Sequence, residues 1–168
     1  MSENLNLRRT KYQEKMNNEQ FNSTNNDKEL KPAWLFNQSG VIPYRKDDSG
    51  IKILLITSRK GKRWVIPKGV IEEEFTPRES AAHEAFEEAG IRGHISTDPI
   101  GEYKYPKWGG MCTVKVFLLE VGEEIDEWPE SPFRQRKWMT VTEAVNFVRE
   151  KALKKMIRNV PVFIIKKK

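Results

Sequence analysis

Polar and hydrophobic positions divide the chain into two parts. Residues 1–32 are polar, rich in asparagine and without periodicity, which predicts a disordered tail. Residues 33–168 alternate short apolar runs with turn signals and helix-patterned segments, which predicts a single folded domain. No internal repeat and no linker interrupts this second part.

Short apolar runs in the second part predict β-strands. They lie at residues 37–46, 51–60, 63–69, 93–107, 112–121 and 134–141. A turn signal, Asp47 to Gly50, separates the first two, and a Trp-Gly-Gly sequence at residues 108–110 lies between two strands that we expect to pair. Pro43 indicates that the first run is an edge strand or is irregular, because proline cannot donate a backbone hydrogen bond.

The segment from Pro77 to Ala89 has the pattern and the end signals of a helix. Thr76 is positioned to cap it, Pro77 suits the first turn, and Glu79 completes a capping box. Gly90 follows where the helix should end.

A second capping box, Thr140 to Glu143, predicts another helix near the C-terminus. The residues expected to face inward are Ala144, Val145, Phe147 and Val148, and the pattern continues through Leu153, Met156 and Ile157. Residues 160–168 form an apolar tail with a basic end, which we interpret as a docked strand or a frayed terminus.

Composition excludes several classes of protein. No apolar run reaches the ~18 residues of a membrane span, and the N-terminus lacks the apolar core of a signal peptide. The single cysteine, Cys112, cannot form an internal disulfide, which favours the cytoplasm. The net charge of +6 suggests a polyanionic partner, although composition alone favours lysines and arginines that only solubilise the surface.

Carboxylates are concentrated on one helix of this basic chain. Glu84, Glu87 and Glu88 have i, i+3, i+4 spacing and share a face, and we expect the opposite face to pack on a sheet through Ala82, Ala85, Phe86 and Ala89. Like charges at this spacing cost about 0.2–0.5 kcal/mol per pair, and the helix dipole disfavours anions in the last turns. Spacing leaves two interpretations open: a solvated polar face, or an oxygen-rich site for a divalent cation.

The same segment resembles the sequence box of the Nudix family. Gly69 matches its first glycine, and the second half is matched in register by Glu84, Ala85, Glu87, Glu88, Gly90 and Ile91. The resemblance covers about residues 36–158 and implies an α/β fold, the Nudix α/β/α sandwich with a mixed β-sheet. Two positions depart: Phe75 stands where the family has glutamate, and His83 where it has arginine. The glutamate usually supports the metal cluster, and the arginine orients the neighbouring catalytic glutamate.

Further segments resemble the diphosphoinositol-polyphosphate phosphohydrolase branch of the family. These are residues 63–69, 87–93 and 126–145. The resemblance implies a polyphosphorylated small-molecule substrate: a diphosphoinositol polyphosphate, a dinucleoside polyphosphate or polyphosphate itself. The implied substrate-binding residues are Arg59, Arg63, Lys68, Arg134 and Arg136.

The resemblance also implies a mechanism. Glu84, Glu87 and Glu88 would be the catalytic residues and, with the carbonyl of Lys68, would bind Mg²⁺, with Mn²⁺ as a second choice; Glu84 would be the base for the attacking water. The expected reaction is hydrolysis of a phosphoanhydride bond.

Two alternatives remain open at the level of sequence. One is the same chemistry on ADP-ribose, a nucleoside triphosphate or an RNA 5′ end, with Tyr103, Tyr105 or Trp108 stacking on a base. The other is a Nudix fold that binds a phosphorylated ligand or RNA without catalysis, because Phe75 and His83 weaken the site. A nucleic acid is the less favoured partner, no membrane partner is expected, and no oligomeric state follows from the sequence.

Overall fold

The computed structural model of the chain describes residues 31–166. The tail predicted at residues 1–32 therefore lies almost wholly outside the described residues and stays a prediction. The residues from Pro32 onward form one compact unit. Within residues 31–166, none of the helices combines the length and the apolar character that a membrane crossing requires.

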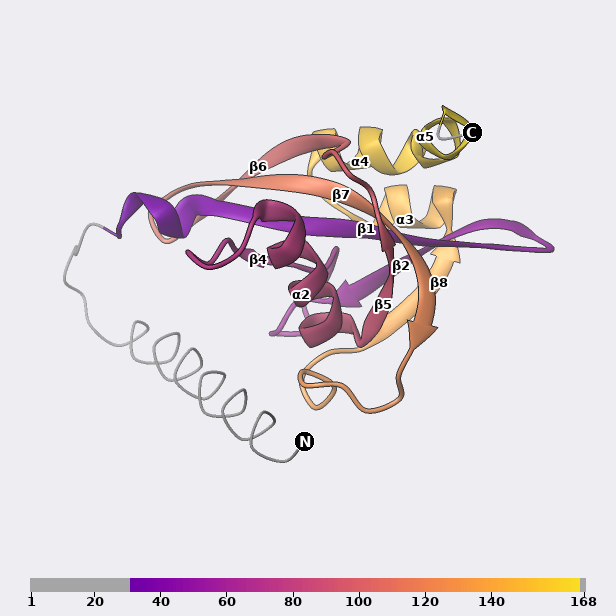
Figure 1. Cartoon of the computed structure of the whole chain (residues 1–168), viewed down its shortest axis with the longest axis horizontal. Coiled ribbons are helices and arrows are strands. Elements are labelled where there is room, and N and C mark those ends of the chain that lie inside the picture. Colours follow the sequence, from indigo (N-terminus) through magenta and orange to yellow (C-terminus); the bar gives the residue numbers. More distant parts are fainter. Residues whose placement is uncertain (1–30, 167–168) are drawn as a thin grey trace. The chain divides into compact units, whose positions relative to one another are not determined.

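A mixed sheet of eight strands organises the described part of the chain (Figure 1). The strands are β1 (Asn37–Asp47), β2 (Gly50–Thr57), β3 (Trp64–Val65), β4 (Lys68–Val70), β5 (Ile91–Ile95), β6 (Gly101–Lys107), β7 (Gly110–Glu124) and β8 (Arg136–Thr140). The order is β3-β2-β1-β7-β5, with β4 paired to β1, β6 to β7 and β8 to β2. Only the β1–β7 pair is parallel among the described pairings.

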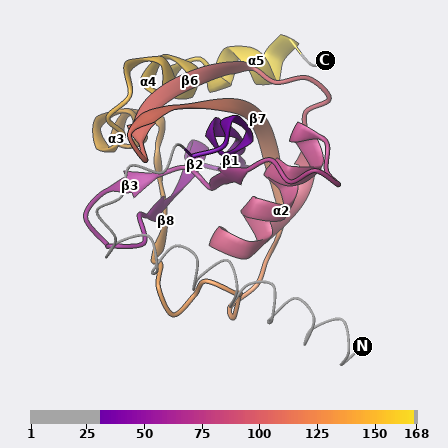
Figure 2. The same ribbon diagram turned by 90° about the vertical axis from the view of Figure 1, so that its left-hand side faces the viewer.

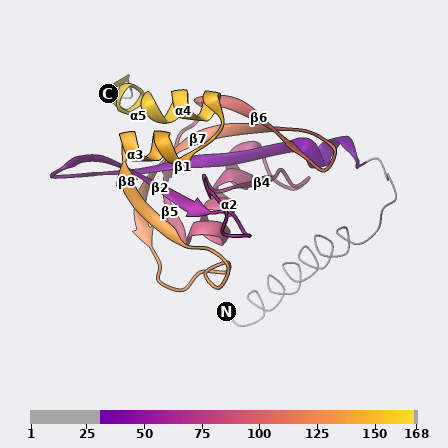
Figure 3. The same ribbon diagram turned by 180° about the vertical axis from the view of Figure 1, so that it is seen from behind.

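Helices cover both faces of the sheet (Figures 2 and 3). A 3₁₀ turn, η1 (Ala33–Phe36), precedes β1; the helices are α2 (Pro77–Ala89), α3 (Val141–Phe147), α4 (Lys151–Arg158) and α5 (Val160–Lys166). One core cluster joins α2 to the sheet, and a larger one joins α3, α4 and α5 to the other face. The predicted α/β/α sandwich with a mixed sheet is therefore confirmed.

Pro43 lies in a central strand, so the edge-strand interpretation is wrong. β1 pairs with β7 along residues 37–44, including Pro43 with Leu119. On its other side β1 pairs with β4 up to Gly40 and with β2 only from Tyr44. The proline is tolerated because it lies where β1 changes partner, which is the irregularity that the sequence also suggested.

Both predicted turns connect antiparallel strands. Asp47 pairs with Gly50 at the end of the β1–β2 hairpin. Trp108 and Gly109 have positive φ angles of 53° and 74° at the β6–β7 turn, as expected of the tight turn types that suit twisted strands.

The C-terminal segments differ from two expectations. The helix that starts at the Thr140 capping box ends at Phe147, and Val148 has an extended backbone (φ −80°, ψ 158°). This break turns Phe147 outward, where it is 46% exposed, so its predicted inward position is wrong. The last segment forms the helix α5 instead of a strand or a frayed end, because Val160 and Ile164, one turn apart, are both buried.

Candidate active site

The helix α2 is fixed at both ends by the residues that the sequence indicated. Thr76 accepts a hydrogen bond from the Glu79 N–H (3.2 Å), and Glu79 accepts one from the Thr76 N–H (2.8 Å). At the other end Gly90 has a left-handed conformation (φ 64°), which glycine adopts at little cost. These caps fix the residues at which the helix begins and ends.

The buried face of α2 carries two of the three candidate glutamates. Ala81, Ala85 and Ala89 are fully buried, whereas Ala82 is exposed, so the helix is rotated from the expected packing face. The same rotation buries Glu84 (4% exposed) and Glu88 (7% exposed). The solvated-face interpretation is therefore wrong for these two residues.

Glu84 packs directly on the backbone of β4. A Cβ atom added to Gly69 would lie 2.0 Å from Glu84 Oε1 and 2.2 Å from its Cδ. Only a glycine leaves room for the carboxylate at this point. The first glycine of the box is thus explained by a close approach between strand and helix. A second contact joins α2 to β4: the Ser80 hydroxyl donates a hydrogen bond to the Val70 carbonyl (3.2 Å).

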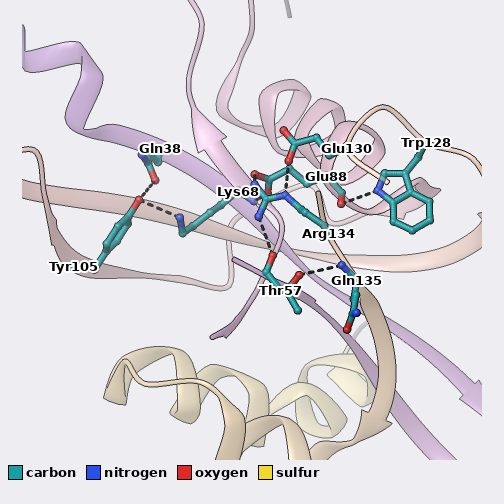
Figure 4. Close-up of polar contacts among 9 residues, drawn as sticks. All are labelled: Gln38, Thr57, Lys68, Glu88, Tyr105, Trp128, Glu130, Arg134 and Gln135. Atoms are coloured by element: carbon teal, nitrogen blue, oxygen red, sulfur yellow. Dashed lines mark hydrogen bonds and ion pairs between the residues drawn. The ribbon is translucent and has the colours of Figure 1, made fainter. Parts of the chain in front are cut away.

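Glu88 lies in a buried polar network (Figure 4). Its Oε2 accepts a hydrogen bond from the Lys68 N–H (2.9 Å), and its Oε1 contacts Arg134. Burial raises the pKa of Glu88 to about 8; Glu84 and Glu130 add to the shift, and Arg134 opposes it. Neighbouring carboxylates with incomplete charge compensation favour a proton or an added cation.

Arg134 connects three parts of the site. Its guanidinium contacts Glu88 on α2 and Glu130 in the preceding loop, and it donates a hydrogen bond to the Thr57 carbonyl (2.9 Å) at the end of β2. The Gln135 N–H donates to Thr57 Oγ1 (2.9 Å) and fixes the same junction. Figure 4 shows the two carboxylates converging on this guanidinium.

The side chain of Lys68 enters a second polar chain on the opposite side. Lys68 Nζ donates to the Tyr105 hydroxyl (3.0 Å), which donates to Gln38 Oε1 (2.7 Å). Burial lowers the pKa of Lys68 to about 8, although Glu88 opposes the shift. Lys68 therefore has two roles: its backbone N–H binds the Glu88 carboxylate, and its side-chain ammonium group places a positive charge nearby.

The other predicted substrate-binding residues lie in different surroundings. Arg59 stacks over Phe133 at 5.2 Å, and Arg63 lies 3.7 Å from Glu150. Arg136 closes the end of α2 by donating to the Ala89 carbonyl (2.8 Å). The substrate roles of these residues stay predictions.

The aromatic residues considered for base stacking are engaged elsewhere. Tyr103 and Tyr105 are 3% and 4% exposed and belong to the larger core cluster. Trp108 packs edge-on against Phe36 (6.4 Å between ring centres) and beneath Lys107 (4.0 Å). Neither tyrosine presents a face to a nucleobase.

The residues present fit a divalent cation in chemistry, although not as a preformed cage. Glu84 and Glu88 are buried carboxylates close enough for one to raise the pKa of the other, and hard cations prefer such oxygen donors. Glu87 lies at the edge of the group, 3.6 Å from His83 Nε2. Among residues 31–166, no three acidic, histidine or cysteine side chains already converge as metal ligands. A cation would therefore draw these carboxylates together.

Two residues of the network were missed by sequence reasoning. Glu130 is 7% exposed and contacts Arg134, while Trp128 donates its indole N–H to the Glu88 carbonyl (3.0 Å). Both lie in the acidic loop between β7 and β8, about 40 residues beyond α2. One sequence feature could have indicated their role. Trp128 and Glu130 lie in an acidic loop of a basic chain, and Arg134, a possible ion-pair partner, follows Glu130 by four residues.

Comparisons with known proteins agree with this geometry. The NUDIX domain matches residues 36–160. Nudix hydrolase 16, mitochondrial, from Arabidopsis thaliana is 40% identical over 134 residues, which cover 69% of this chain and 74% of that protein. Diphosphoinositol polyphosphate phosphohydrolase 3-beta from Bos taurus is 28% identical over 116 residues, or 68% of this chain and 70% of that protein.

A solved structure has the same fold. The binary complex of the C. elegans Ap4A hydrolase superposes with a TM-score of 0.67 at 24% identity, and the match covers 77% of this chain and 98% of that one. Divalent metal ions are the general cofactors of Nudix hydrolases, in keeping with the carboxylates of α2. The chain belongs to the Nudix family and is a hydrolase of phosphoanhydride bonds.

Proposed function

We propose that this chain hydrolyses, with Mg²⁺, a phosphoanhydride bond in a polyphosphorylated small molecule. The observation that carries the proposal is the burial of Glu84 and Glu88 against β4, beside the cations Lys68 and Arg134. Carboxylates suit a hard metal ion, and nearby cations suit phosphate groups.

The relatives support a substrate that carries many phosphates. One relative is named for the hydrolysis of diphosphoinositol polyphosphates, and it aligns over 68% of this chain. The basic loop between β2 and β3, with Arg59, Lys60, Lys62 and Arg63, adds cations at the end of β2. We therefore favour diphosphoinositol polyphosphates, long dinucleoside polyphosphates or polyphosphate.

Glu84, Glu87, Glu88 and the carbonyl of Lys68 would hold the metal. When bound, Mg²⁺ (or Mn²⁺) supplies positive charge at the reacting phosphate and lowers the pKa of a bound water. Glu84 would accept the proton of the attacking water; its carboxylate lies directly against Gly69, next to the residue whose carbonyl would help to hold the metal. Arg59, Arg63 and Lys68 would hold flanking phosphates, the arginines through bidentate contacts. Each of Arg63, Lys68, Arg134 and Arg136 contacts another protein group, and would have to share or release that partner to hold a phosphate.

The alternative of a binding module without catalysis, left open by the sequence, does not agree with the hydrolase relatives. For the other alternative, the same chemistry on ADP-ribose, a nucleoside triphosphate or an RNA 5′ end, burial of Tyr103 and Tyr105 removes two of the three aromatic residues that could have stacked on a base. Retention of Glu84, Glu87 and Glu88 supports an enzyme.

A substrate panel tests the proposal. Diphosphoinositol pentakisphosphate, diadenosine hexaphosphate, polyphosphate and ADP-ribose are each incubated with the protein, with and without Mg²⁺. The double variant Glu84→Gln/Glu88→Gln removes the buried carboxylates, and Glu73→Gln, at an exposed position before α2, is the matched control. We expect metal-dependent cleavage of the long polyphosphates by the wild type and the control only. Binding of these compounds without turnover would support the binding module.

Cytoplasmic localisation is part of the same proposal. Cys112 is buried and unpaired, as suits a reducing compartment. Subcellular fractionation of the tagged full chain tests it, and recovery in an organelle fraction would contradict it.

A further inference from the structure

The two positions at which the chain departs from the Nudix box are in contact. Phe75, where the box has glutamate, and His83, where it has arginine, have ring centres 5.4 Å apart with the planes tilted by 38°. They are eight positions apart in the sequence, on either side of the start of α2. In this fold a glutamate and an arginine at the same two positions would also be neighbours.

His83 also lies beside one of the candidate metal-binding glutamates, Glu87. His83 Nε2 lies 3.6 Å from Glu87 Oε1, one helical turn further along α2. The His83 side chain is 32% exposed and that of Glu87 is 16% exposed, so both lie at the edge of the buried site. The backbone of Phe75 is fixed in the turn before the helix, because its N–H donates a hydrogen bond to the Glu72 carbonyl (3.0 Å).

We propose that Phe75 and His83 form a positioning pair that holds the carboxylate of Glu87. The ring of Phe75 limits the rotamers of His83 at the helix surface, as aromatic contacts do. His83 in turn limits the movement of Glu87. Neither residue touches the reacting atoms. The inference rests on the proposed function for the role of Glu87, but the contact itself does not.

The pair explains why both departures occur together. If only Phe75 were glutamate, a new carboxylate would face His83 and the already acidic edge formed by Glu87. If only His83 were arginine, its guanidinium would face Glu87 on one side and the apolar ring of Phe75 on the other. With both positions changed, from glutamate and arginine to Phe75 and His83, the two side chains stay in contact, but the contact is between aromatic rings instead of charged groups.

A double-mutant cycle on the full chain tests the pair. The variants are Phe75→Glu, His83→Arg and the two combined, with Mg²⁺ affinity from calorimetry and with kcat and KM measured separately. We expect each single variant to weaken Mg²⁺ binding and lower kcat about threefold to tenfold, and the double variant to recover to within about threefold of wild type. KM for the substrate should change less than about twofold in all three, because neither residue contacts it.

Two controls separate positioning from a general loss of structure. Phe75→Tyr keeps the ring and should resemble wild type. Phe147→Ala removes an exposed aromatic contact with Trp64 (6.2 Å between ring centres) on the other side of the sheet, and should leave Mg²⁺ affinity unchanged. Thermal unfolding of every variant shows which ones remain folded.

The possible results separate the two proposals. Independent effects, in which the single losses multiply in the double variant, would overturn the pair. So would a Phe75→Glu protein with the Mg²⁺ affinity and kcat of wild type. If the wild type neither binds Mg²⁺ nor cleaves any substrate, the proposed function fails; the pair then stands or falls on whether the unfolding free energies of the cycle are coupled.

Discussion

Arg134 forms an ion pair with Glu88 although both side chains are almost fully buried, with exposed fractions of 9% and 10%. Its guanidinium also contacts Glu130. One cation therefore compensates two carboxylates in the interior. Removing one partner of a buried ion pair costs more than the pair contributes, because a charge remains without compensation.

Arg134→Met should therefore destabilise the metal-free protein by on the order of 3–5 kcal/mol, measured by urea unfolding above the Glu88 pKa of about 8, where that carboxylate is ionised. Adding Glu88→Gln should recover part of the loss, since a neutral amide costs less to bury than a carboxylate. Arg158→Met, at an exposed position of α4, is the control. Equal stability of Arg134→Met and this control would contradict the buried network.

The raised pKa of Glu88 predicts how stability depends on pH without metal. Its pKa is raised from 4.5 to about 8, first by burial. Because the folded state holds the proton more tightly, this group stabilises the fold at low pH, and the contribution is lost as pH rises from 4.5 to about 8. We expect the free energy of unfolding to fall more steeply over this range in wild type than in Glu88→Gln. Equal slopes would show that Glu88 does not titrate there.

Gly69 is predicted to be essential for placing Glu84. In Gly69→Ala the added Cβ would lie 2.0 Å from Glu84 Oε1, so the carboxylate must move. Displacement of a catalytic group by about 1 Å can reduce kcat about 100-fold. Gly122→Ala in β7 is the matched control, because nothing lies within 4 Å of its added Cβ. A Gly69→Ala protein with the kcat of the control would contradict the role of the close approach.

Arg136 and Arg59 should respond differently to the same change. Arg136 donates to the Ala89 carbonyl, lies 3.2 Å from Glu124 and stacks over Trp128 (4.2 Å). Arg136→Met should therefore lower stability by about 1–3 kcal/mol with little effect on KM. Arg59→Met should raise KM about tenfold with little loss of stability, since a phosphate contact is a charge-assisted hydrogen bond. The reverse result, a KM effect confined to Arg136, would support the substrate role predicted for it from the sequence and contradict that of Arg59.

Local chemistry made the ends of α2 predictable. The residues at these ends act on backbone groups within about four residues of themselves, so the neighbouring sequence is enough to predict their effects. They are Thr76, Pro77, Glu79 and Gly90. The strands and turns around Asp47–Gly50 and Trp108 were found for the same reason. The resemblance to the Nudix box, with its fixed spacing of residues, predicted the overall fold.

Long-range packing decided what the sequence did not show. The pattern on α2 could not distinguish Ala82 from Ala81 as the buried position, and this one-residue difference moved Glu84 to the interior. Phe147 turned outward because the helix ends at that residue. Glu130 joined the site through a loop whose path depends on contacts with Arg134 and with the far end of α2.

The proposed function depends on the buried glutamates of α2, which would support metal-dependent cleavage of phosphoanhydride bonds. The most direct measurement is the initial rate of diphosphoinositol pentakisphosphate hydrolysis across a Mg²⁺ titration, for wild type, Glu84→Gln and Glu73→Gln. On this proposal we expect saturable activation for wild type and Glu73→Gln, and loss of activity in Glu84→Gln at every Mg²⁺ concentration. A rate that persists in the presence of chelator, or an active Glu84→Gln protein, would contradict it.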